Sequence, residues 1–449
     1  MKKLCLFLII SKLAFAQTIS FEEALNQTIE NSKDLQKQKI NIDIAKTNSD
    51  FIDGLNFGKV SLNSDISRTN HSGYVFMGKL SSRDATFRDF GFIENTGDMS
   101  IAPKDLNYPD AYTSINSYIS YDLPLFTGFA LYHQKGILKL QEKANEILYN
   151  LDKKTLEFEV LKAYNSAVLA KDFVKTMQKA KDTIGFIKNG AKEFHKNGLV
   201  TKIDVNEAEL YFLNTNSNLI EAENNFKLSL AYLKFLTSNE NISDVENLQN
   251  TYLEIKEFED LYKIALKNRD EITLQNISIE ANNKNIKANQ GSYYPSVFTH
   301  LEYGYNDDKF STSKDKDYYM ALLGISLTLF DGTRSANLEK SRLEYLKAKL
   351  DFEKLQDGIK LEVQKAILDY KAKQEILKEK ILASELASSV LNQAKLQYKN
   401  RLISMTTLLS QETNYRQSQT MLLNAKYENS LALARLNLVL GQNLQKDYK

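Results

Sequence analysis

Cysteine is nearly absent from this chain of 449 residues, because Cys5 is the only one. A lone thiol so close to the N-terminus leaves the rest of the chain without a disulfide or a thiolate metal site. An excess of one charge is also missing, since 58 lysines and arginines oppose 57 acidic residues, for a formal net charge of +1. A nearly neutral chain has no bulk electrostatic attraction to nucleic acid, so we expect no nucleic-acid partner.

Motifs of catalysis and cofactor binding are missing too. The chain has no glycine-rich phosphate loop and no nucleophile elbow, and its histidines lack the spacing of metal ligands. We interpret each histidine as an exposed or loop residue; they are His71, His133, His195 and His300. The acidic residues lie among lysines, which is typical of solvated helix surfaces. We therefore expect no enzyme activity, no cofactor and no metal.

Long apolar runs are absent after residue 16, where none approaches the ~20 residues that a membrane helix needs. If such a chain enters a membrane, it must do so as a closed β-barrel, whose short strands carry a weaker alternating pattern. What is present at the N-terminus is a secretory pattern over residues 1–16. Two lysines precede a short apolar run, and Ala14-Phe15-Ala16 supplies a small-x-small cleavage pattern before Gln17. Lys12 interrupts the apolar run, so a buried N-terminal helix is the alternative.

An internal duplication organises the rest of the chain. Residues 159–163 correspond to residues 362–366, and the same offset relates several later pairs of segments. Residues 21–23 correspond to residues 258–260 at a larger offset, so the first repeat contains an insertion between residues 36 and 125. These units are far longer than solenoid repeats, which indicates one duplication. We expect a signal peptide (1–16), a first repeat (17–240), an inter-repeat linker or equatorial segment (241–257), a second repeat (258–445) and a C-terminal tail (446–449).

Each repeat contains a very long helix and a return helix joined by a tight turn. Residues 131–196 contain no proline, and as one helix they would reach ~100 Å. Apolar residues recur there at alternating spacings of four and three, as in the seam of a coiled coil. The seam consists of Phe173, Met177, Ala180, Ile184, Ile187, Ala191 and Phe194. A shorter helix precedes these elements, and Ser20 with Glu23 three residues later predicts its capping box.

Four short segments alternate apolar and polar residues and are predicted as strands. They cover residues 59–68, 113–123, 296–305 and 319–329. Each is close to the 9–11 residues of a membrane strand, and tyrosines cluster at their ends, as in an interfacial aromatic girdle. We expect one face to point to lipid, the face that carries Ile115, Ile119, Leu323, Ile325 and Leu327. A soluble antiparallel sheet with one wet face would alternate equally well.

The additional residues of the first repeat fall in segment 69–111, which glycines and prolines punctuate. We expect an extracellular loop here, beside the shorter loop 306–317. A folded periplasmic insertion is the alternative.

Several motifs, placed at matching positions of the two repeats, resemble the TolC family of outer-membrane channels. They are Ser20-Phe21-Glu22-Glu23-Ala24-Leu25, Leu123-Pro124-Leu125-Phe126-Thr127-Gly128, Leu329-Phe330-Asp331-Gly332, Asn197-Gly198-Leu199-Val200-Thr201-Lys202-Ile203-Asp204-Val205 and the final segment 425–441. The stretch from Gly73 to Asp110 also resembles a surface loop of some members. The resemblance covers nearly the whole chain after residue 16.

The resemblance implies an α+β membrane protein in which three protomers build one long antiparallel coiled-coil helical tunnel. Each protomer would contribute four β-strands to a trimeric outer-membrane β-barrel. The implied function is an outer-membrane channel, the exit duct of a tripartite efflux or type I secretion system. It would pass substrate from a periplasmic adaptor (membrane fusion) protein and an inner-membrane pump to the exterior. The implied partners are the other protomers of a homotrimer, the adaptor, the pump and outer-membrane lipid, with the helical tunnel in the periplasm.

A non-conducting exported coiled-coil protein, structural or adhesive, is the alternative. The strands argue against it, because a pure coiled coil does not need them.

The resemblance also implies two sites at the helical tips. The adaptor-docking tips would be the turns Gly198, Leu199, Val200, Thr201 and Arg401, Leu402, Ile403, Ser404. The gate would comprise Asp204, Tyr398 and Arg401, with Thr407 and Ser410 at positions where the family carries an acidic ring. Arg401 departs from the small residue expected in the turn, and we expect it to pair with Asp204. Alternatively, Asp204 serves only to start the return helix.

Overall fold

A computed structural model describes the fold of residues 17–94, 97–247 and 257–442. The expected signal peptide, part of the inter-repeat segment and the C-terminal tail lie outside these residues. The chain forms two compact units, each of which combines residues of both repeats. The first unit includes residues 1–41, 144–276 and 350–449, and the second includes residues 42–143 and 277–349.

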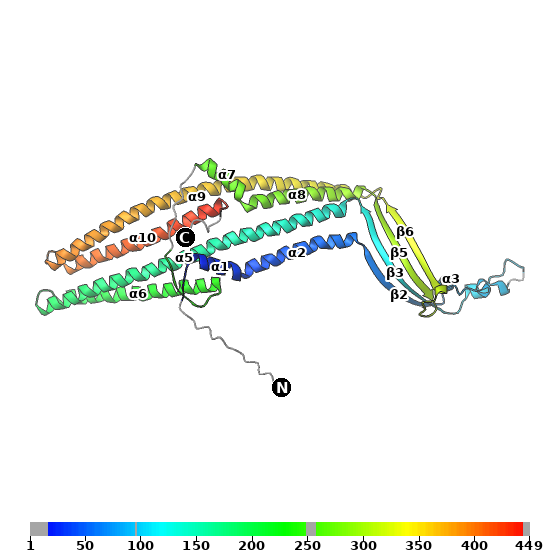
Figure 1. Cartoon of the computed structure of the whole chain (residues 1–449), viewed down its shortest axis with the longest axis horizontal. Coiled ribbons are helices and arrows are strands. Elements are labelled where there is room, and N and C mark those ends of the chain that lie inside the picture. The colour runs from blue at the N-terminus through cyan, green and yellow to red at the C-terminus, as the bar shows by residue number, and fades with distance from the viewer. Residues whose placement is uncertain (1–16, 95–96, 248–256, 443–449) are drawn as a thin grey trace, which may run out of the picture. The chain divides into compact units, whose positions relative to one another are not determined.

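Helices dominate the described chain, with six strands between them (Figure 1). The helices are α1 (Phe21–Asn31), α2 (Lys33–Asn56), α3 (Ser72–Ser81), α4 (Lys104–Asn107), α5 (Ala130–Lys196), α6 (Lys202–Thr237), α7 (Phe258–Asn268), α8 (Asp270–Gln290), α9 (Arg334–Lys399) and α10 (Met405–Val439). The strands are β1 (Gln17–Ile19), β2 (Lys59–Thr69), β3 (Tyr112–Thr127), β4 (Ile242–Val245), β5 (Ser296–Asp307) and β6 (Asp317–Ser326). Short 3₁₀ turns are η1 (Phe87–Phe90), η2 (Phe92–Glu94), η3 (Gly291–Tyr293) and η4 (Lys314–Lys316).

The two predicted helical hairpins are confirmed as α5–α6 and α9–α10. Helix α5 contains 67 residues and α9 contains 66. The predicted seam of α5 is buried, since Ile184 and Ala191 are fully inaccessible and only Phe173 and Phe194 at its two ends are half-buried. The predicted capping box is also present, because Glu23 N donates to Ser20 Oγ and Ser20 N donates to Glu23 Oε2, both at 3.2 Å.

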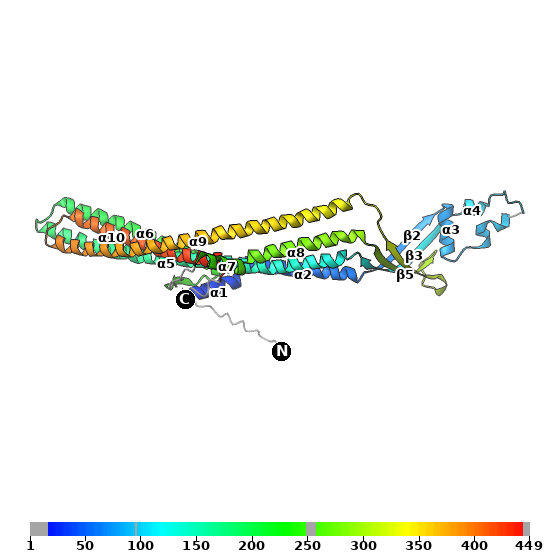
Figure 2. The ribbon, with the colours of Figure 1, turned by 90° about the horizontal axis from the view of Figure 1, so that it is seen from above.

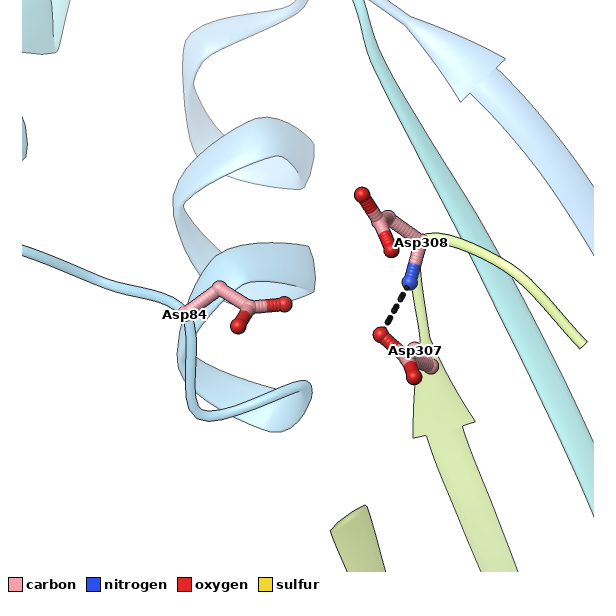
Figure 3. A group of neighbouring side chains, drawn as sticks. All are labelled: Asp84, Asp307 and Asp308. Carbon is pink, nitrogen blue, oxygen red and sulfur yellow. Dashed lines mark hydrogen bonds between the residues drawn. The ribbon is translucent and has the colours of Figure 1, made fainter. Parts of the chain in front are cut away.

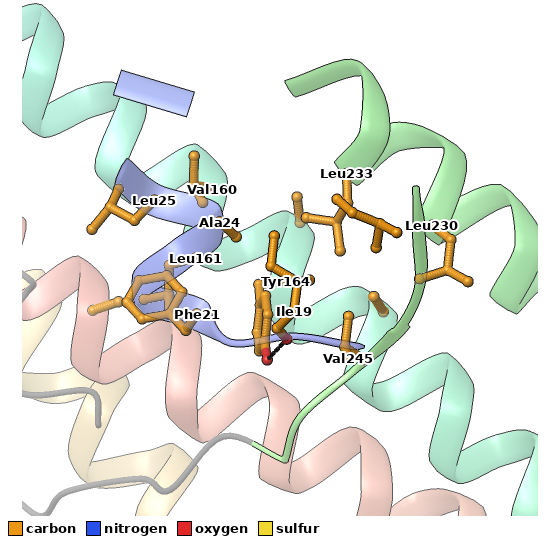
Figure 4. Packing of buried hydrophobic residues seen from close by; sticks show 14 residues of the cluster. Ile19, Phe21, Ala24, Leu25, Val160, Leu161, Tyr164, Leu230, Leu233 and Val245 are labelled. Carbon is orange, nitrogen blue, oxygen red and sulfur yellow. Dashed lines mark hydrogen bonds between the residues drawn. The ribbon is translucent and has the colours of Figure 1, made fainter. Parts of the chain in front are cut away.

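The first unit has a core for each repeat, and the two cores use equivalent positions. Val160 and Leu233 are buried in one cluster, and their repeat partners Val363 and Leu436 are buried in the other. The first cluster also holds Tyr164, whose hydroxyl donates to the carbonyl oxygen of Ile19 at 2.9 Å (Figure 4). The same hydroxyl lies 3.0 Å from the carbonyl oxygen of Glu246. That tyrosine therefore fastens the parallel pair β1–β4 to α5, and its burial raises its pKa.

The second unit contains a four-stranded antiparallel sheet in the order β2-β3-β5-β6 (Figures 1 and 2). Side chains of directly paired residues lie on the same face of such a sheet. One face is mainly apolar and includes Leu62, Ile119, Leu301, Leu323 and Ile325. The opposite face is mainly polar and includes Asn63, Tyr118, Ser120, Asp122, His300 and Glu302. The predicted face is thus confirmed within the sheet for Ile115, Ile119, Leu323 and Ile325, whereas Leu327 lies beyond the end of β6. Contact of the apolar face with lipid stays a prediction.

Strand β6 begins two residues earlier and ends three residues earlier than the alternation predicts. The reason is the pairing register, because Ser326 pairs with Ser296, the first residue of β5. Beyond Ser326 the chain has no partner on β5, although Leu327 and Leu329 continue the apolar alternation.

The insertion at 69–111 has secondary structure of its own, comprising α3, η1, η2 and α4. The hydroxyls of Ser82 and Tyr112 lie 2.7 Å apart, and Gly78 packs on the ring of Tyr112. The Arg83 guanidinium donates to the carbonyl oxygens of Asp315 and Asp317 at 2.8 and 2.7 Å. The segment is therefore attached to the same end of the sheet as the 306–317 loop, and its extracellular position stays a prediction.

Within the parts of the chain that the structure describes, no helix is both long and apolar enough to span a bilayer.

Candidate functional site at the hairpin tips

The two hairpin tips have the same backbone geometry. In the first, Gly198 N donates to His195 O at 2.9 Å and Leu199 N donates to Phe194 O at 2.8 Å. In the second, the amides of Arg401 and Leu402 make the equivalent bonds to Tyr398 O and Gln397 O at 2.9 and 2.8 Å. Arg401 therefore adopts the left-handed conformation of Gly198, with φ of 62° against 71°. A side chain costs about 1–2 kcal/mol in that region, and the turn forms in spite of it.

Apolar side chains at both tips are exposed. Leu199 is 43% exposed and Leu402 is 72% exposed, while Val200 and Ile403 are half-buried. Each tip ends at a hydroxyl N-cap, since Thr201 Oγ1 accepts from Asp204 N and Ser404 Oγ accepts from Thr407 N. Both turns therefore present an exposed leucine at the end of the hairpin.

Asp204 is the acidic residue of a capping box. Its Oδ2 accepts hydrogen bonds from the amide and hydroxyl of Thr201 at 2.8 and 2.7 Å, and these bonds lower the pKa of Asp204. Among the described residues no ion pair joins Asp204 to Arg401. The expected pair is therefore replaced by the alternative role, because the carboxylate is already directed to the start of α6.

Tyr398 lies between the two hairpins. It shares a pocket of about 290 Å³ with Phe194, Asp204 and Arg401. Its hydroxyl is buried and has no hydrogen-bond partner within the described chain. Burial is the main cause of its raised pKa, and the nearby charge of Asp204 adds to it. Three of the expected gate residues, Asp204, Tyr398 and Arg401, thus line one cavity. The Tyr398 hydroxyl remains available there for a hydrogen bond.

The expected ring positions lie on the exposed side of α10. Thr407 and Ser410 are both exposed, and Thr407 takes part in the N-cap with Ser404. The nearest acidic residue of that helix, Glu412, is only 2% exposed and points elsewhere, 3.7 Å from Arg416 Nε. That separation is too long for a good hydrogen bond. Burial is the main cause of the raised pKa of Glu412, and the positive charge of Arg416 only partly opposes it.

One contact between the hairpins was not expected from the sequence. Thr406 Oγ1 donates to Glu207 Oε2 at 3.0 Å and links α10 to α6. Both residues lie within two turns of the tips, but a threonine and a glutamate 199 positions apart give no recognisable spacing. Repeat alignment would have placed both residues at the tips without indicating that they bond.

A second cluster of charged groups lies at the far end of the sheet. Asp84, Asp307 and Asp308 bring carboxylates within 4.8 Å of one another (Figure 3). Lys316 supplies a positive charge to this cluster, because its ammonium group contacts Asp84 directly and lies 3.8 Å from Asp307. We interpret the cluster as an ion-paired anchor of the insertion.

His300, expected to be exposed or in a loop, lies in β5 on the polar face of the sheet. Its ring nitrogens lie 2.7 Å from Asp122 Oδ1 and 3.2 Å from Glu302 Oε2. Asp122 is the residue paired with His300 on β3, and Glu302 lies two residues further along β5 on the same face. The sequence alone does not give the strand register, so it could not predict these neighbours.

The fold is that of known outer-membrane channels. The structure of CusC superposes with a TM-score of 0.78 at 13% identity, covering 95% of this chain and 93% of that one. The CmeC outer membrane channel of Campylobacter jejuni gives 0.74 at 14% identity over 94% and 85% of the two chains. The outer membrane protein VceC of Vibrio cholerae gives 0.75 at 15% identity over 94% and 96%. The protein therefore has the TolC-like fold of these channel proteins.

Sequence comparison agrees with this class for the second repeat. Residues 261–442 match the family described as Outer membrane efflux protein. No curated protein sequence matches the chain. The match covers the second repeat, and the likeness of fold extends over nearly the whole chain.

Proposed function

We propose that the chain is the exit duct of a tripartite export system. In this proposal an inner-membrane pump and a periplasmic adaptor deliver substrate to the helical tips, and the duct conducts it across the outer membrane. The observation that carries the proposal is the combination, in one chain, of a four-stranded sheet and two helical hairpins with exposed apolar tips. A coiled-coil spacer or adhesin would need neither the sheet nor identical turns at both tips.

The proposal includes association into a homotrimer, because one protomer leaves its sheet open. Strands β2 and β6 are the two edges of the described sheet. Their apolar residues are strongly exposed in the single chain, with Leu62 at 79% and Ile325 at 71%. Unpaired edges attract further strands, and pairing β2 of one copy with β6 of the next would satisfy both edges.

The tips are the proposed docking surface for the adaptor. Leu199 and Leu402 are the exposed apolar residues of two turns that share one geometry. The adaptor would meet equivalent surfaces from both repeats, which suits a partner that binds several copies of one motif around the tunnel end.

Charge substitution at the tips tests the docking assignment. Leu199→Asp and Leu402→Asp should each reduce export severely, because an exposed carboxylate at the centre of an apolar contact must be desolvated there. Heat-sensitive gel mobility should show that the trimer is intact. Asn197→Asp and Asn400→Asp provide matched controls, since they add the same charge beside the leucines and remove no apolar contact. Normal export from both leucine variants would contradict the docking assignment.

The same gel experiment separates the proposal from the coiled-coil alternative. An unheated trimer with a closed membrane-spanning sheet should migrate as a compact oligomer, and a rod of helices should not.

A further inference from the structure

A basic pocket lies where the strands meet the helices of the second unit. It has a volume of about 470 Å³, and Lys135 and Lys139 of α5 and Lys284 of α8 line it. Its apolar side includes Leu125, in the bulge that interrupts the β3–β5 pairing, and Phe129. No acidic side chain is among the described residues that line it.

The positive charge of this pocket is only partly compensated. Lys135 pairs with Asp53, and Lys284 lies 3.5 Å from Glu280 on its own helix. Lys139 makes no ion pair within the described residues and is exposed. A further sign of positive potential is His133, whose pKa is lowered first by burial and then by the nearby Lys287 and Lys284.

The backbone adds to this preference for an anion. Helix α5 begins at Ala130, directly beside the pocket, and its first turn contains no acidic residue. The second repeat is different, because Asp331 precedes α9 and its carboxylate accepts from the amide and hydroxyl of Thr333 at 2.8 Å. Thr127 occupies the position of Asp331 in the matching motif of the first repeat. The positive end of the α5 dipole is therefore left without its own carboxylate.

The opposite side of the pocket is apolar and open. Phe129 is 54% exposed, Leu125 is 54% exposed and Tyr132 is 72% exposed. The turn that presents them is fixed, since Gly128 and Phe129 are both left-handed, with φ of 61° and 66°, and a Cβ at Gly128 would lie 2.2 Å from Gly291 O. Aromatic residues beside lysines, at the end of membrane strands, are typical of the bilayer interface.

We propose that this pocket binds the phosphate of an anionic phospholipid of the periplasmic leaflet of the outer membrane. Lys139 and Lys284, with the N-terminus of α5, hold the headgroup phosphate, and the acyl chains lie along Leu125 and Phe129. The exposed apolar side is what favours a lipid over free phosphate, because free phosphate would leave it in water. This inference rests on the outer-membrane position given under the proposed function, and it holds for any adaptor or pump.

The absence of tryptophan allows a direct test. A Tyr132→Trp variant of the full chain in nanodiscs carries its only indole at the pocket, where brominated lipids quench it. The association constant obtained from quenching should be about fivefold higher for brominated phosphatidylglycerol than for brominated phosphatidylcholine. That is the gain expected from one lysine near an anionic lipid. A Tyr319→Trp variant, on the exposed apolar face of β6, should show no such preference.

Removing charge should then abolish the preference at the pocket alone. In the Tyr132→Trp background, Lys139→Gln should bring the ratio to about one, and Lys284→Gln should lower it as well. Lys143→Gln is the matched control, because Lys143 is exposed on α5 one turn further along and does not line the pocket. Trimer mobility on unheated gels checks assembly, and conductance of the same preparations tests the duct separately.

Three results would overturn the proposal. The first is equal quenching by the two lipids at Tyr132→Trp. The second is an equal loss of preference in Lys143→Gln and Lys139→Gln. The third is loss of the preference in millimolar inorganic phosphate, which would make this a site for the free anion.

Discussion

Gly198 and Arg401 occupy the same left-handed position in the two hairpin turns, with φ of 71° and 62°. The amide of each donates to the residue three positions earlier, and the amide of the next residue closes the turn. Glycine adopts this conformation without steric cost, whereas arginine does not.

Arg401→Gly should therefore stabilise the protein. Relief of the left-handed strain is worth about 1 kcal/mol, reduced by the greater freedom of glycine in the unfolded chain. Thermal unfolding followed by circular dichroism in detergent should show a higher midpoint. Gly198→Ala is the converse control and should lower the midpoint through backbone strain alone, because a Cβ there meets no atom within 4 Å. A lower midpoint for Arg401→Gly would mean that the arginine side chain contributes more than its backbone costs.

Arginine substitutions in the middle of β6 test which face of the sheet meets lipid. Leu322 and Leu323 are neighbours of the same residue type on opposite faces, 47% and 64% exposed. Leu323→Arg should cost about 2–4 kcal/mol on the apolar face, whereas Leu322→Arg on the polar face should cost much less. Yield of heat-sensitive trimer in the outer membrane and unfolding in urea measure the difference. Equal tolerance of the two arginines would contradict the assignment of the faces.

Glu209 and Glu412 correspond in the two repeats but should have opposite pH dependence. Glu209 pairs with Lys192 at 3.0 Å and Lys188 at 3.5 Å, and its pKa is lowered chiefly by Lys192. Its contribution to stability is present above the unfolded pKa and is lost as pH falls through the folded pKa. The buried Glu412 has a raised pKa, so it lowers stability as pH rises from about 4.3 through its folded pKa.

Glutamine substitutions should separate these two effects. Relative to the parent chain, Glu412→Gln should gain stability as pH rises, and Glu209→Gln should be less stable near neutrality but not in acid. Denaturant midpoints measured over a series of pH values give both trends. Parallel trends for the two variants would show that Glu412 is not buried in the assembled protein.

The pocket between the hairpins leads to a prediction about gating. Tyr398 has a buried hydroxyl without a partner inside the protomer, and Asp204 lies at the same pocket. We expect a neighbouring protomer to supply the hydroxyl's partner in the closed channel. Asp204→Ala combined with Tyr398→Phe should then raise single-channel conductance in planar bilayers. Divalent cations should block weakly, since Thr407 and Ser410 carry no charge.

Thr201→Ala distinguishes this latch from helix capping. It removes the hydroxyl that accepts from Asp204 N and donates to Asp204 Oδ2, but it keeps the carboxylate and the Thr201 amide that donates to it. Loss of such a cap costs about 0.5–2 kcal/mol of stability and should leave conductance unchanged. Equal conductance in the parent chain and in the variant that combines Asp204→Ala with Tyr398→Phe would contradict the prediction of a latch.

The helices and strands could be predicted from the sequence, but the contacts between them could not. Periodicity located the seam that buries Ile184 and the alternation that puts Leu323 on one face, because both patterns are local. The turn at Arg401 could be expected only through its repeat partner. The bond from Thr406 to Glu207, the position of His300 between Asp122 and Glu302, and the end of β6 depend on register and helix packing, which local patterns do not contain.

Asp204 shows how one motif can support two roles. An aspartate three residues after a threonine predicts a capping box, and its position in the family motif predicts a gate. The structure uses the carboxylate for the first role, because the Thr201 amide and hydroxyl are its nearest donors.

The pairing of β1 with β4 has a consequence for the order in which the chain can fold. Gln17 pairs with Ile242, and Tyr164 lies against the carbonyls of Ile19 and Glu246. During synthesis the N-terminal segment is made first, yet its strand partner follows only after both helices of the first hairpin. The apolar residues of α1 must remain soluble through that interval, since their burial needs contacts of high sequence separation. Helix α1 is therefore made early but can be buried only late, after residue 245 has followed.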